Sequence, residues 1–300
     1  MVHDEYLLFR RRICRTRLGD WRLEFGMTFP TLFAGKALAR ASLQGLAAGV
    51  ALALLLHGPA QAALPDEIQV YVDDLNDPGV LGLQEHINTT PVGSSDPGYP
   101  GESLARHGTR FTSEFAYGLN PDLEAGAYLP VVVEANRYVR VACVKLRLKW
   151  VPVKPTDGAA GIFAGLNGEL SQVAYRFDSS RRAFELRPIL GWRNAQWLVA
   201  VNPVFEFPLQ GPERSQSPGF SPQFKVARTV AQGVAAGFEY YAELGPVSDF
   251  EPYAEQQHSL YAALDIDRKP WNINFGIGRG FTQSTDRWTI KMIIEIPLGS

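Results

Sequence analysis

The chain has 300 residues, 46% of them hydrophobic, and its 29 Lys and Arg nearly balance its 31 Asp and Glu, giving a formal net charge of -2. This balance, without a long basic run beyond the N-terminal region, argues against nucleic acid as a partner. No apolar stretch reaches the roughly 20 residues that a spanning helix needs. Spanning strands remain compatible with this composition, because they carry apolar residues only at alternate positions.

A secretory signal is predicted over residues 27–62. Lys36 and Arg40 supply its positive charge, and residues 45–56 form an apolar core of the usual length. A small-x-small sequence at residues 60–62 then predicts cleavage. Because this core is too short to span a membrane, we favour cleavage over the alternatives of an uncleaved anchor or a short buried helix.

The boundaries of the mature chain follow from this signal. Residues 1–26 do not fit a signal of ordinary layout, so we expect translation to begin at Met27, with an unusually long signal as the alternative. Residues 1–62 are then a leader with the signal peptide. Residues 63–79 are predicted to form a periplasmic N-terminal segment, and residues 80–298 an outer-membrane barrel.

The N-terminal segment of the mature chain alternates weakly and ends in an acidic cluster. Ile68, Val70 and Val72 are apolar at every second position, and residues 73–79 are rich in Asp, Asn, Pro and Gly. Carboxylates and turn carbonyls suit calcium. The spacing is not that of a calcium-binding loop, however, and Asn-Asp-Pro-Gly indicates a turn by itself. We therefore favour a solvated turn over a calcium site.

The rest of the chain is predicted to be all-β, a closed antiparallel transmembrane β-barrel of about twelve strands. Val144, Leu146, Leu148 and Trp150 show the pattern, because they occupy one face of a strand while three cations occupy the other. A closed ring of such strands satisfies every backbone hydrogen bond while its apolar side chains face lipid. The expected strands lie near residues 80–88, 108–118, 122–132, 139–152, 160–174, 183–192, 196–208, 223–230, 233–244, 258–267, 271–280 and 286–297.

The expected connections alternate in length, which favours a barrel over a soluble sandwich. Outer-membrane barrels have short periplasmic turns and longer outer loops. Aromatic residues near many of the predicted strand ends are also typical of interfacial girdles. Tight turns are expected at residues 119–122, 154–158, 193–195, 231–232 and 267–270; longer polar loops are expected at 89–107, 177–182, 209–222 and 245–257, with shorter ones at 134–137 and 282–285.

Residues 115–126, Phe-Ala-Tyr-Gly-Leu-Asn-Pro-Asp-Leu-Glu-Ala-Gly, form a distinctive hairpin. An aromatic-x-Gly-Leu segment enters a tight turn and an alternating strand leaves it, which resembles the strand–turn–strand unit of proteobacterial outer-membrane barrels. By pattern, most of residues 80–298 resembles the broad group of outer-membrane transporters that includes the protein linked to the meta-pathway of phenol degradation. The resemblance implies an export signal, a barrel and passage of small solutes, and it carries over no binding residues. One departure is the end of the chain, Pro-Leu-Gly-Ser, where such barrels usually have an aromatic residue that the assembly machinery recognises.

Charged side chains opposite the apolar face are expected to point into the barrel. Ionised groups are costly to remove from water unless they are hydrated or paired, so the interior is either a wet pore or a set of ion pairs, and both alternatives stay open. Lys145, Arg147 and Lys149 against a carboxylate-rich remainder would create a transverse field that selects solutes by charge. The lumen-facing selectivity candidates are Lys145, Arg147, Lys149, Arg187, Glu124, Glu169, Glu185, Glu239, Glu243, Asp265 and Glu295, and further inward charges are expected at Arg110, Glu114, Glu206 and Lys291.

Signals for catalysis, metal binding or cofactor binding are weak. The mature chain has His86, His107 and His258, without the spacing of a catalytic dyad or a metal site. Cys143 is alone in the mature chain and has no disulfide partner, so we expect a small inward-facing residue. Glycines within residues 276–280 follow a strand, but no helix follows them, so we expect them to relieve crowding or permit a bend. We expect no catalytic residue, no cofactor and no metal.

The sequence thus predicts a monomeric outer-membrane barrel of a Gram-negative bacterium, through whose charged lumen a small solute passes passively. A non-conducting structural or adhesive barrel is the alternative, and an outer-membrane hydrolase is a weaker one. The expected partners are outer-membrane lipid, a small-molecule solute and the outer-membrane assembly machinery.

Overall fold

The computed structural model describes residues 67–156 and 159–298. The predicted leader, with its start at Met27 and its cleavage site, lies outside the described residues. The described residues form strands and loops, and none of them belongs to a helix that is long and apolar enough to cross a membrane.

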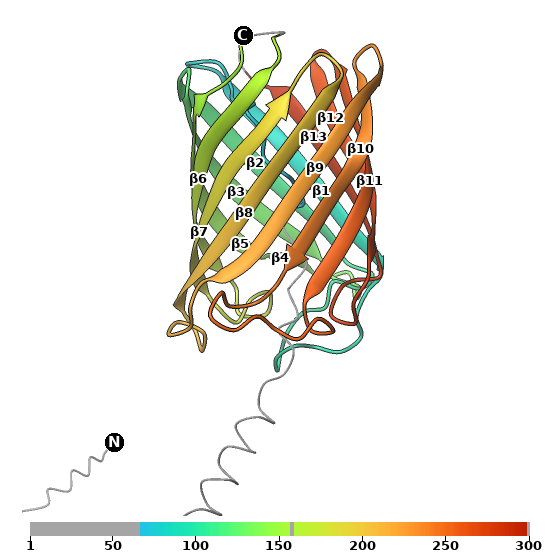
Figure 1. Cartoon of the computed structure of the whole chain (residues 1–300). Helices are drawn as coiled ribbons and strands as arrows, with labels where there is room; N and C mark the ends of the chain where they lie inside the picture. The colour runs from blue at the N-terminus through green and yellow to red at the C-terminus, as the bar shows by residue number, and fades with distance from the viewer. Residues whose placement is uncertain (1–66, 157–158, 299–300) are drawn as a thin grey trace, which may run out of the picture. The chain divides into compact units, whose positions relative to one another are not determined.

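A single antiparallel sheet closes on itself to form a barrel (Figure 1). The first strand, β1 (Leu81–Val92), pairs with β2 (Thr109–Asn120) on one side and with β13 (Trp288–Pro297) on the other, and β2 pairs in turn with β3 (Leu123–Val133). Closure leaves the ring without an open edge, which a sheet in lipid requires. The remaining strands are β4 (Val139–Val141), β5 (Cys143–Val153), β6 (Gly161–Val173), β7 (Arg182–Arg193), β8 (Trp197–Gln210), β9 (Gly219–Ala231), β10 (Val234–Glu243), β11 (Gln257–Arg268) and β12 (Trp271–Gly280).

One of the thirteen strands is a short extension beside β3. β4 has three residues and pairs with the end of β3, while β5 pairs with the beginning of β3. Ala142 lies between β4 and β5 and donates its N–H to the carbonyl of Pro130 at 2.8 Å, so the pairing continues through it. The other twelve strands form the ring. The predicted all-β, closed antiparallel barrel of about twelve strands is therefore confirmed.

The two faces of the sheet differ as the alternation predicts. On β5, the side chains of Val144, Leu146, Leu148 and Trp150 are 49–59% exposed, whereas the intervening cations Arg147 and Lys149 are buried. Exposed apolar side chains recur on the outer face of the other long strands. An apolar outer band with a charged interior is the arrangement of a transmembrane barrel.

The two ends of the barrel differ in the length of their connections (Figure 1). The end where β1 begins carries short turns, such as the one between β2 and β3, and the opposite end carries the longer loops. The predicted loop over residues 209–222 is shorter than expected, because β8 continues to Gln210 and β9 begins at Gly219. Pro222 lies in the extended part of β9, opposite Pro203 of β8. Proline lacks the N–H that a sheet ladder uses, so Pro222 favours a loop in the sequence pattern where the strand continues.

Glycines on the inner face make room for large inward side chains. A Cβ atom on Gly278 would lie 2.3 Å from ring atoms of Tyr261, and one on Gly126 would lie 2.8 Å from the side chain of Arg147. Both distances are shorter than any tolerable contact between heavy atoms. The glycines within residues 276–280 therefore relieve crowding, one of the two roles predicted for them.

Candidate functional site

The chain that precedes β1 lies inside the barrel. Residues 67–79, called here the inner segment, are irregular, and Ile68, Val70 and Tyr71 within them are buried. The segment joins the wall at the short-turn end, where Gly79 donates its N–H to the carbonyl of Gly118 at 2.8 Å. We expected residues 63–79 to form a periplasmic N-terminal segment. The described part of that segment enters the barrel interior, where Ile68, Val70 and Tyr71 are buried.

One side of the inner segment is apolar and packs against an apolar patch of the wall. This patch consists of inward-facing side chains of four consecutive ring strands, β5 to β8, and Val70 and Tyr71 are packed against it. Burial does not follow the weak alternation of Ile68, Val70 and Val72, because Tyr71 and Asp73 at intervening positions are buried as well. The patch residues are Val151, Phe163, Ile189 and Ala200.

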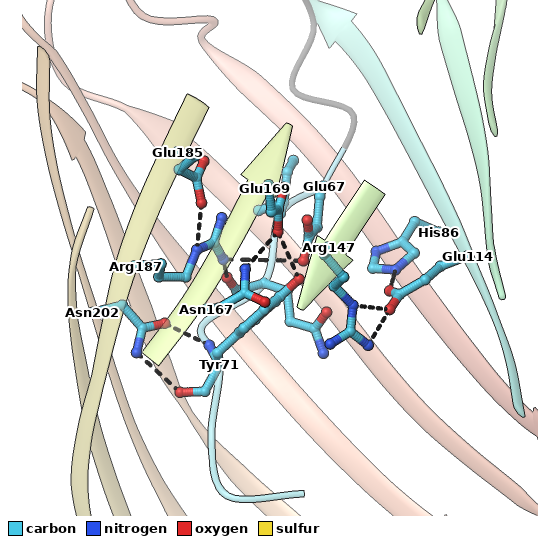
Figure 2. Close-up of polar contacts among 12 residues, drawn as sticks. Glu67, Tyr71, His86, Glu114, Arg147, Asn167, Glu169, Glu185, Arg187 and Asn202 are labelled. Carbon is cyan, nitrogen blue, oxygen red and sulfur yellow. Dashed lines mark hydrogen bonds and ion pairs between the residues drawn. The ribbon is translucent and has the colours of Figure 1, made fainter. Parts of the chain in front are cut away.

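Tyr71 is the main polar anchor of the inner segment (Figure 2). Its backbone N–H donates to Oδ1 of Asn202 at 2.6 Å, and Nδ2 of Asn202 donates to its carbonyl at 3.1 Å. Its hydroxyl lies 2.6 Å from the hydroxyl of Tyr128 and 3.2 Å from Oε1 of Glu169. Burial, together with the nearby carboxylates of Glu67 and Glu169, raises the pKa of Tyr71 well above its ordinary value. The phenol therefore stays protonated and remains a hydrogen-bond donor.

Cations of the wall satisfy backbone carbonyls of the inner segment. Nζ of Lys291 donates to the carbonyl of Ile68 at 2.9 Å, and a guanidinium nitrogen of Arg187 donates to that of Gln69 at 3.1 Å. Nζ of Lys149 donates to the carbonyl of Asp74 at 2.7 Å. An irregular buried segment has no ladder partners, so its backbone needs donors of this kind. The charged wall thus has a structural role in holding the segment.

Arg147 lies at the centre of a buried ion cluster (Figure 2). Its Nε donates to Glu114 Oε1 at 2.6 Å, and its Nη2 donates to Glu124 Oε1 at 2.6 Å. Glu114 also lies 3.4 Å from Nε2 of His86. The sequence left open whether the inward charges are hydrated in a wet pore or joined in ion pairs. Arg147 is joined in ion pairs.

Lys145 and Lys149, the two lysines on either side of Arg147 in the inward row of β5, each form an ion pair with a carboxylate, whereas Arg147 pairs with two buried ones. Nζ of Lys145 lies 3.7 Å from Glu169, and Nζ of Lys149 lies 2.7 Å from Oδ1 of Asp74. The three predicted cations are therefore close to carboxylates and do not form an unopposed positive surface. A role for them in solute selection remains a proposal.

A second charged cluster lies on the wall formed by β9 to β13. Glu239 is paired with Lys291 and, at 3.1 Å, with Lys225, which also contacts Asp265 at 2.8 Å. Asn274 donates to Oδ1 of Asp265 at 2.7 Å. Lys225 was not among the predicted candidates, because Pro222 and Arg228 obscure the alternation of β9. Counting alternate positions backward from Ala227 would have placed Lys225 on the inner face.

Other predicted candidates lie apart from these clusters. Arg187 donates to Glu185 at 2.8 Å. Glu243 accepts a bond from Gln257 at 2.7 Å, near the loop end. Glu295 accepts one from Asn272 at 3.3 Å, near the short-turn end. The sequence did not indicate Tyr71, Asn202 or His86 as interior contacts, because each depends on a partner that is distant in the chain.

A cavity of about 370 Å³ lies beside the inner segment. Residues of the inner segment line one side of it, and inward side chains of β9 to β13 line much of the rest. Within the described residues, no ion pair joins two of its acidic residues, Asp267 and Glu295, to a cation. The charged lining residues are Asp73, Asp74, Arg193, Lys225, Glu239, Asp265, Asp267 and Glu295.

Two adjacent carboxyl groups of the inner segment are shifted in opposite directions. Burial raises the pKa of Asp73, although Arg193 at 2.9 Å opposes this shift. For Asp74, removal from bulk water also disfavours the charge, but the ammonium of Lys149 outweighs it and lowers the pKa. Asp73 and Asp74 each form an ion pair with a cation of the wall, and of the two it is for Asp74 that the pairing outweighs burial.

The described residues form no group of three or more His, Cys, Asp and Glu side chains suited to a metal ion. The predicted calcium alternative at residues 73–79 thus has no ligand cluster there. His258 contacts the hydroxyl of Tyr240 at 2.6 Å and Oε1 of Gln256 at 2.9 Å, while His86 contacts Glu114.

No protein-family model matches the chain, and no curated protein matches its sequence. Solved structures do match its fold. An outer membrane channel from Pseudomonas putida F1 is 10% identical with a TM-score of 0.50, and the match covers 77% of this chain and 100% of that one. The KdgM porin is 10% identical with a TM-score of 0.47, covering 73% and 99%. Outer membrane phospholipase A from Escherichia coli is 13% identical with a TM-score of 0.40, covering 82% and 99%. At these identities the likeness concerns the fold, which is that of an outer-membrane β-barrel.

Proposed function

We propose that this chain is a passive channel for small polar solutes in the outer membrane of a Gram-negative bacterium. The observation that carries the proposal is the cavity of about 370 Å³ beside the inner segment, whose lining combines charged and amide side chains with apolar ones. A barrel that is apolar outside and both charged and hollow inside has the construction of a pore. The likeness in fold to the Pseudomonas putida F1 channel supports this function, as does the resemblance to the transporter group that includes the phenol meta-pathway protein.

The inner segment is proposed to be the constriction of this channel. It occupies part of the lumen between the wall cations and the apolar patch of β5 to β8. Solutes would pass through the remaining space beside it, so the channel admits small molecules and excludes large ones. No cofactor is needed for passive passage.

The charges of the cavity favour cations in this proposal. Lys225 and Lys291 form ion pairs with Glu239, and Lys149 forms one with Asp74, whereas Asp267 and Glu295 line the cavity without an ion pair to a described cation. Rings of carboxylates lower the energy of a cation in a pore. The predicted candidates Glu239, Asp265 and Glu295 thus contribute to selectivity, while the predicted field from the β5 cations is largely compensated.

A non-conducting barrel is the second candidate, and the anchoring of the inner segment favours it. Tyr71, Ile68 and Asp74 are each bonded to the wall, so the segment could seal the lumen permanently. A hydrolase is the third candidate. The likeness to a phospholipase barrel, with a TM-score of 0.40 and 13% identity, does not by itself support this activity.

Liposome swelling separates these candidates. Mature protein, residues 63–300, is refolded into vesicles, which are then diluted into isosmotic sugars of increasing size. A channel gives swelling with the smallest sugars and a steep decline with size. A sealed barrel gives no swelling above empty vesicles, and that result would overturn the proposal. Release of fatty acid from the same vesicles would instead support the hydrolase.

A further inference from the structure

Glu85 is an ionisable side chain on the outer, lipid-facing surface of the barrel. It alternates with buried His86 and shares its face with Leu81, which is 39% exposed. On the neighbouring strand β2 it pairs with Ser113, whose outward neighbours on that strand are the exposed Phe111 and Phe115. Glu85 is a charged residue among apolar ones in the alternation of β1, and the register shows that it faces outward.

The position of Glu85 lies within the apolar band. At the short-turn end, Leu81 of β1 pairs with Tyr117, and at the loop end Val92 pairs with Trp288, so aromatic side chains mark both levels. Four residues of a strand tilted by about 45° place Glu85 roughly 9 Å inside the first level, in a band about 25 Å tall. Lipid headgroups do not reach this depth.

Other outward charges lie at the edges of the band. Arg228 lies over the ring of Trp197 and Arg279 over the ring of Trp288, with distances of 5.4 and 5.2 Å to the ring centroids. Both tryptophans begin a strand. Long cationic side chains at such positions extend to the headgroups. Glu85 is short and lies deeper, so this explanation does not apply to it.

The barrel itself satisfies Glu85 only partly. The hydroxyl of Ser113 donates to Oε2 of Glu85 at 2.7 Å. A carboxylate can accept about four hydrogen bonds, and leaving the others unmade in hydrocarbon is costly. Two outward positions toward the loop end, beyond the apolar pair of Ile87 and Phe111, the hydroxyl of Thr109 donates to that of Thr89 at 3.2 Å. The pair of Glu85 and Ser113 and the pair of Thr89 and Thr109 are together called here the polar strip of the β1–β2 face.

We propose that the β1–β2 face is the contact surface of a two-fold symmetric dimer of this chain, held by the polar strip. Glu85 needs hydrogen-bonding groups at its own depth, and a two-fold axis along the membrane normal preserves depth. A second copy therefore brings its own Ser113 and Glu85 to the level where they are needed. The apolar neighbours Phe111 and Phe115 pack around the strip and exclude lipid. This dimer differs from the monomer expected from the sequence.

Two facing carboxylates require a shared proton. One Glu85 carboxyl, carrying a proton taken from water, donates its O–H to the carboxylate of the other copy, so the dimer binds one proton more than two separate ionised monomers. The side chains that face Glu85 from the adjacent strands are Ser113 of β2 and Ile294 of β13, and neither carries a charge. Association should therefore strengthen as the pH falls.

The test is sedimentation equilibrium of the refolded mature chain, residues 63–300, in density-matched detergent at pH 5 and pH 8. We expect dimers that are tighter at pH 5. Glu85→Gln keeps a neutral donor and acceptor and should dimerise equally at both pH values. Glu85→Leu should weaken the dimer by about tenfold to a hundredfold, since two symmetry-related polar contacts are lost.

The matched control is Leu146→Ala, an outward change on β5, away from the β1–β2 seam. It should leave the dimer unchanged. A wild-type chain that is monomeric at both pH values would overturn the proposal. A dimer that survives Glu85→Leu with unchanged affinity would overturn it as well, because a different surface would then form the contact. Heat-modifiable migration of each variant verifies that the barrel has folded.

Discussion

Tyr71 and Asn202 exchange two hydrogen bonds across the barrel interior, although 131 residues separate them in the chain. The side-chain amide of Asn202 accepts from the N–H of Tyr71 and donates to its carbonyl, as a neighbouring strand would. A single inward residue of β8 therefore replaces a strand partner for the inner segment. This pair joins the inner segment to the wall.

Asn202→Leu should loosen the inner segment without unfolding the barrel. The change leaves a buried N–H and a buried carbonyl of Tyr71 unpaired, at a cost of about 1–3 kcal/mol each. We expect a larger or more frequently open conductance together with a barrel that still shows heat-modifiable migration. Val201→Ala, on the outer face of the same strand, is the control and should leave conductance unchanged. Equal conductance in both variants would show that Asn202 does not hold the constriction.

The cations of β5 should contribute unequally to stability. Arg147→Met leaves Glu114 and Glu124 buried without their shared cation, and we expect a loss of about 3–5 kcal/mol. Lys145→Met removes a more exposed and looser pair, at 3.7 Å from Glu169, and should cost about 1 kcal/mol or less. Equilibrium unfolding by urea in lipid vesicles measures both. Similar decreases in the free energy of unfolding for the two variants would contradict the claim that Arg147 holds the buried ion cluster together.

Open channels should prefer cations. Asp267 and Glu295 line the cavity without an ion pair to a described cation, so the double variant Asp267→Asn, Glu295→Gln should reduce the preference. The reversal potential in a KCl gradient measures this preference directly. Thr229→Ala, an uncharged change in the same lining, is the control. Anion preference in the wild type would contradict the assignment.

Conductance should rise when Asp74 is protonated. Lys149 lowers the pKa of Asp74 in the folded state. The ion pair therefore stabilises the inner segment at any pH above the ordinary pKa of an aspartate, 3.8. That stabilisation is lost as the pH falls through the lowered value. We expect an increase in conductance below about pH 4 that is absent in Asp74→Asn, which should already be more conductive at neutral pH. If conductance depended on pH in the same way in the wild type and in Asp74→Asn, the Asp74 carboxylate would not be what holds the inner segment in place.

The alternation of Val144 to Trp150 shows why the barrel could be predicted from the sequence. Lipid-facing and inward side chains have to alternate along every spanning strand, so the pattern and the fold have the same cause. Pro222 interrupts the signal, and there the predicted strand start at residue 223 was wrong, because β9 begins at Gly219. The short turns also could be predicted, because Asn, Asp, Pro and Gly mark them locally.

The contents of the barrel could not be predicted in the same way. Ile68, Val70 and Val72 alternate weakly, but no local pattern tells whether the segment that contains them packs inside or outside the wall. The pairing of Arg147 with Glu114 and Glu124 depends on register across three strands, which the sequence does not specify. Inward charges were therefore predictable as a set, and their partners were not.

Single-channel conductance of the refolded chain, residues 63–300, in a planar bilayer tests the central claim most directly. The proposed function predicts small, discrete, salt-dependent steps in the wild type and larger steps in Asn202→Leu. A folded wild type and a folded Asn202→Leu variant that are both silent would contradict a channel function and indicate a sealed barrel.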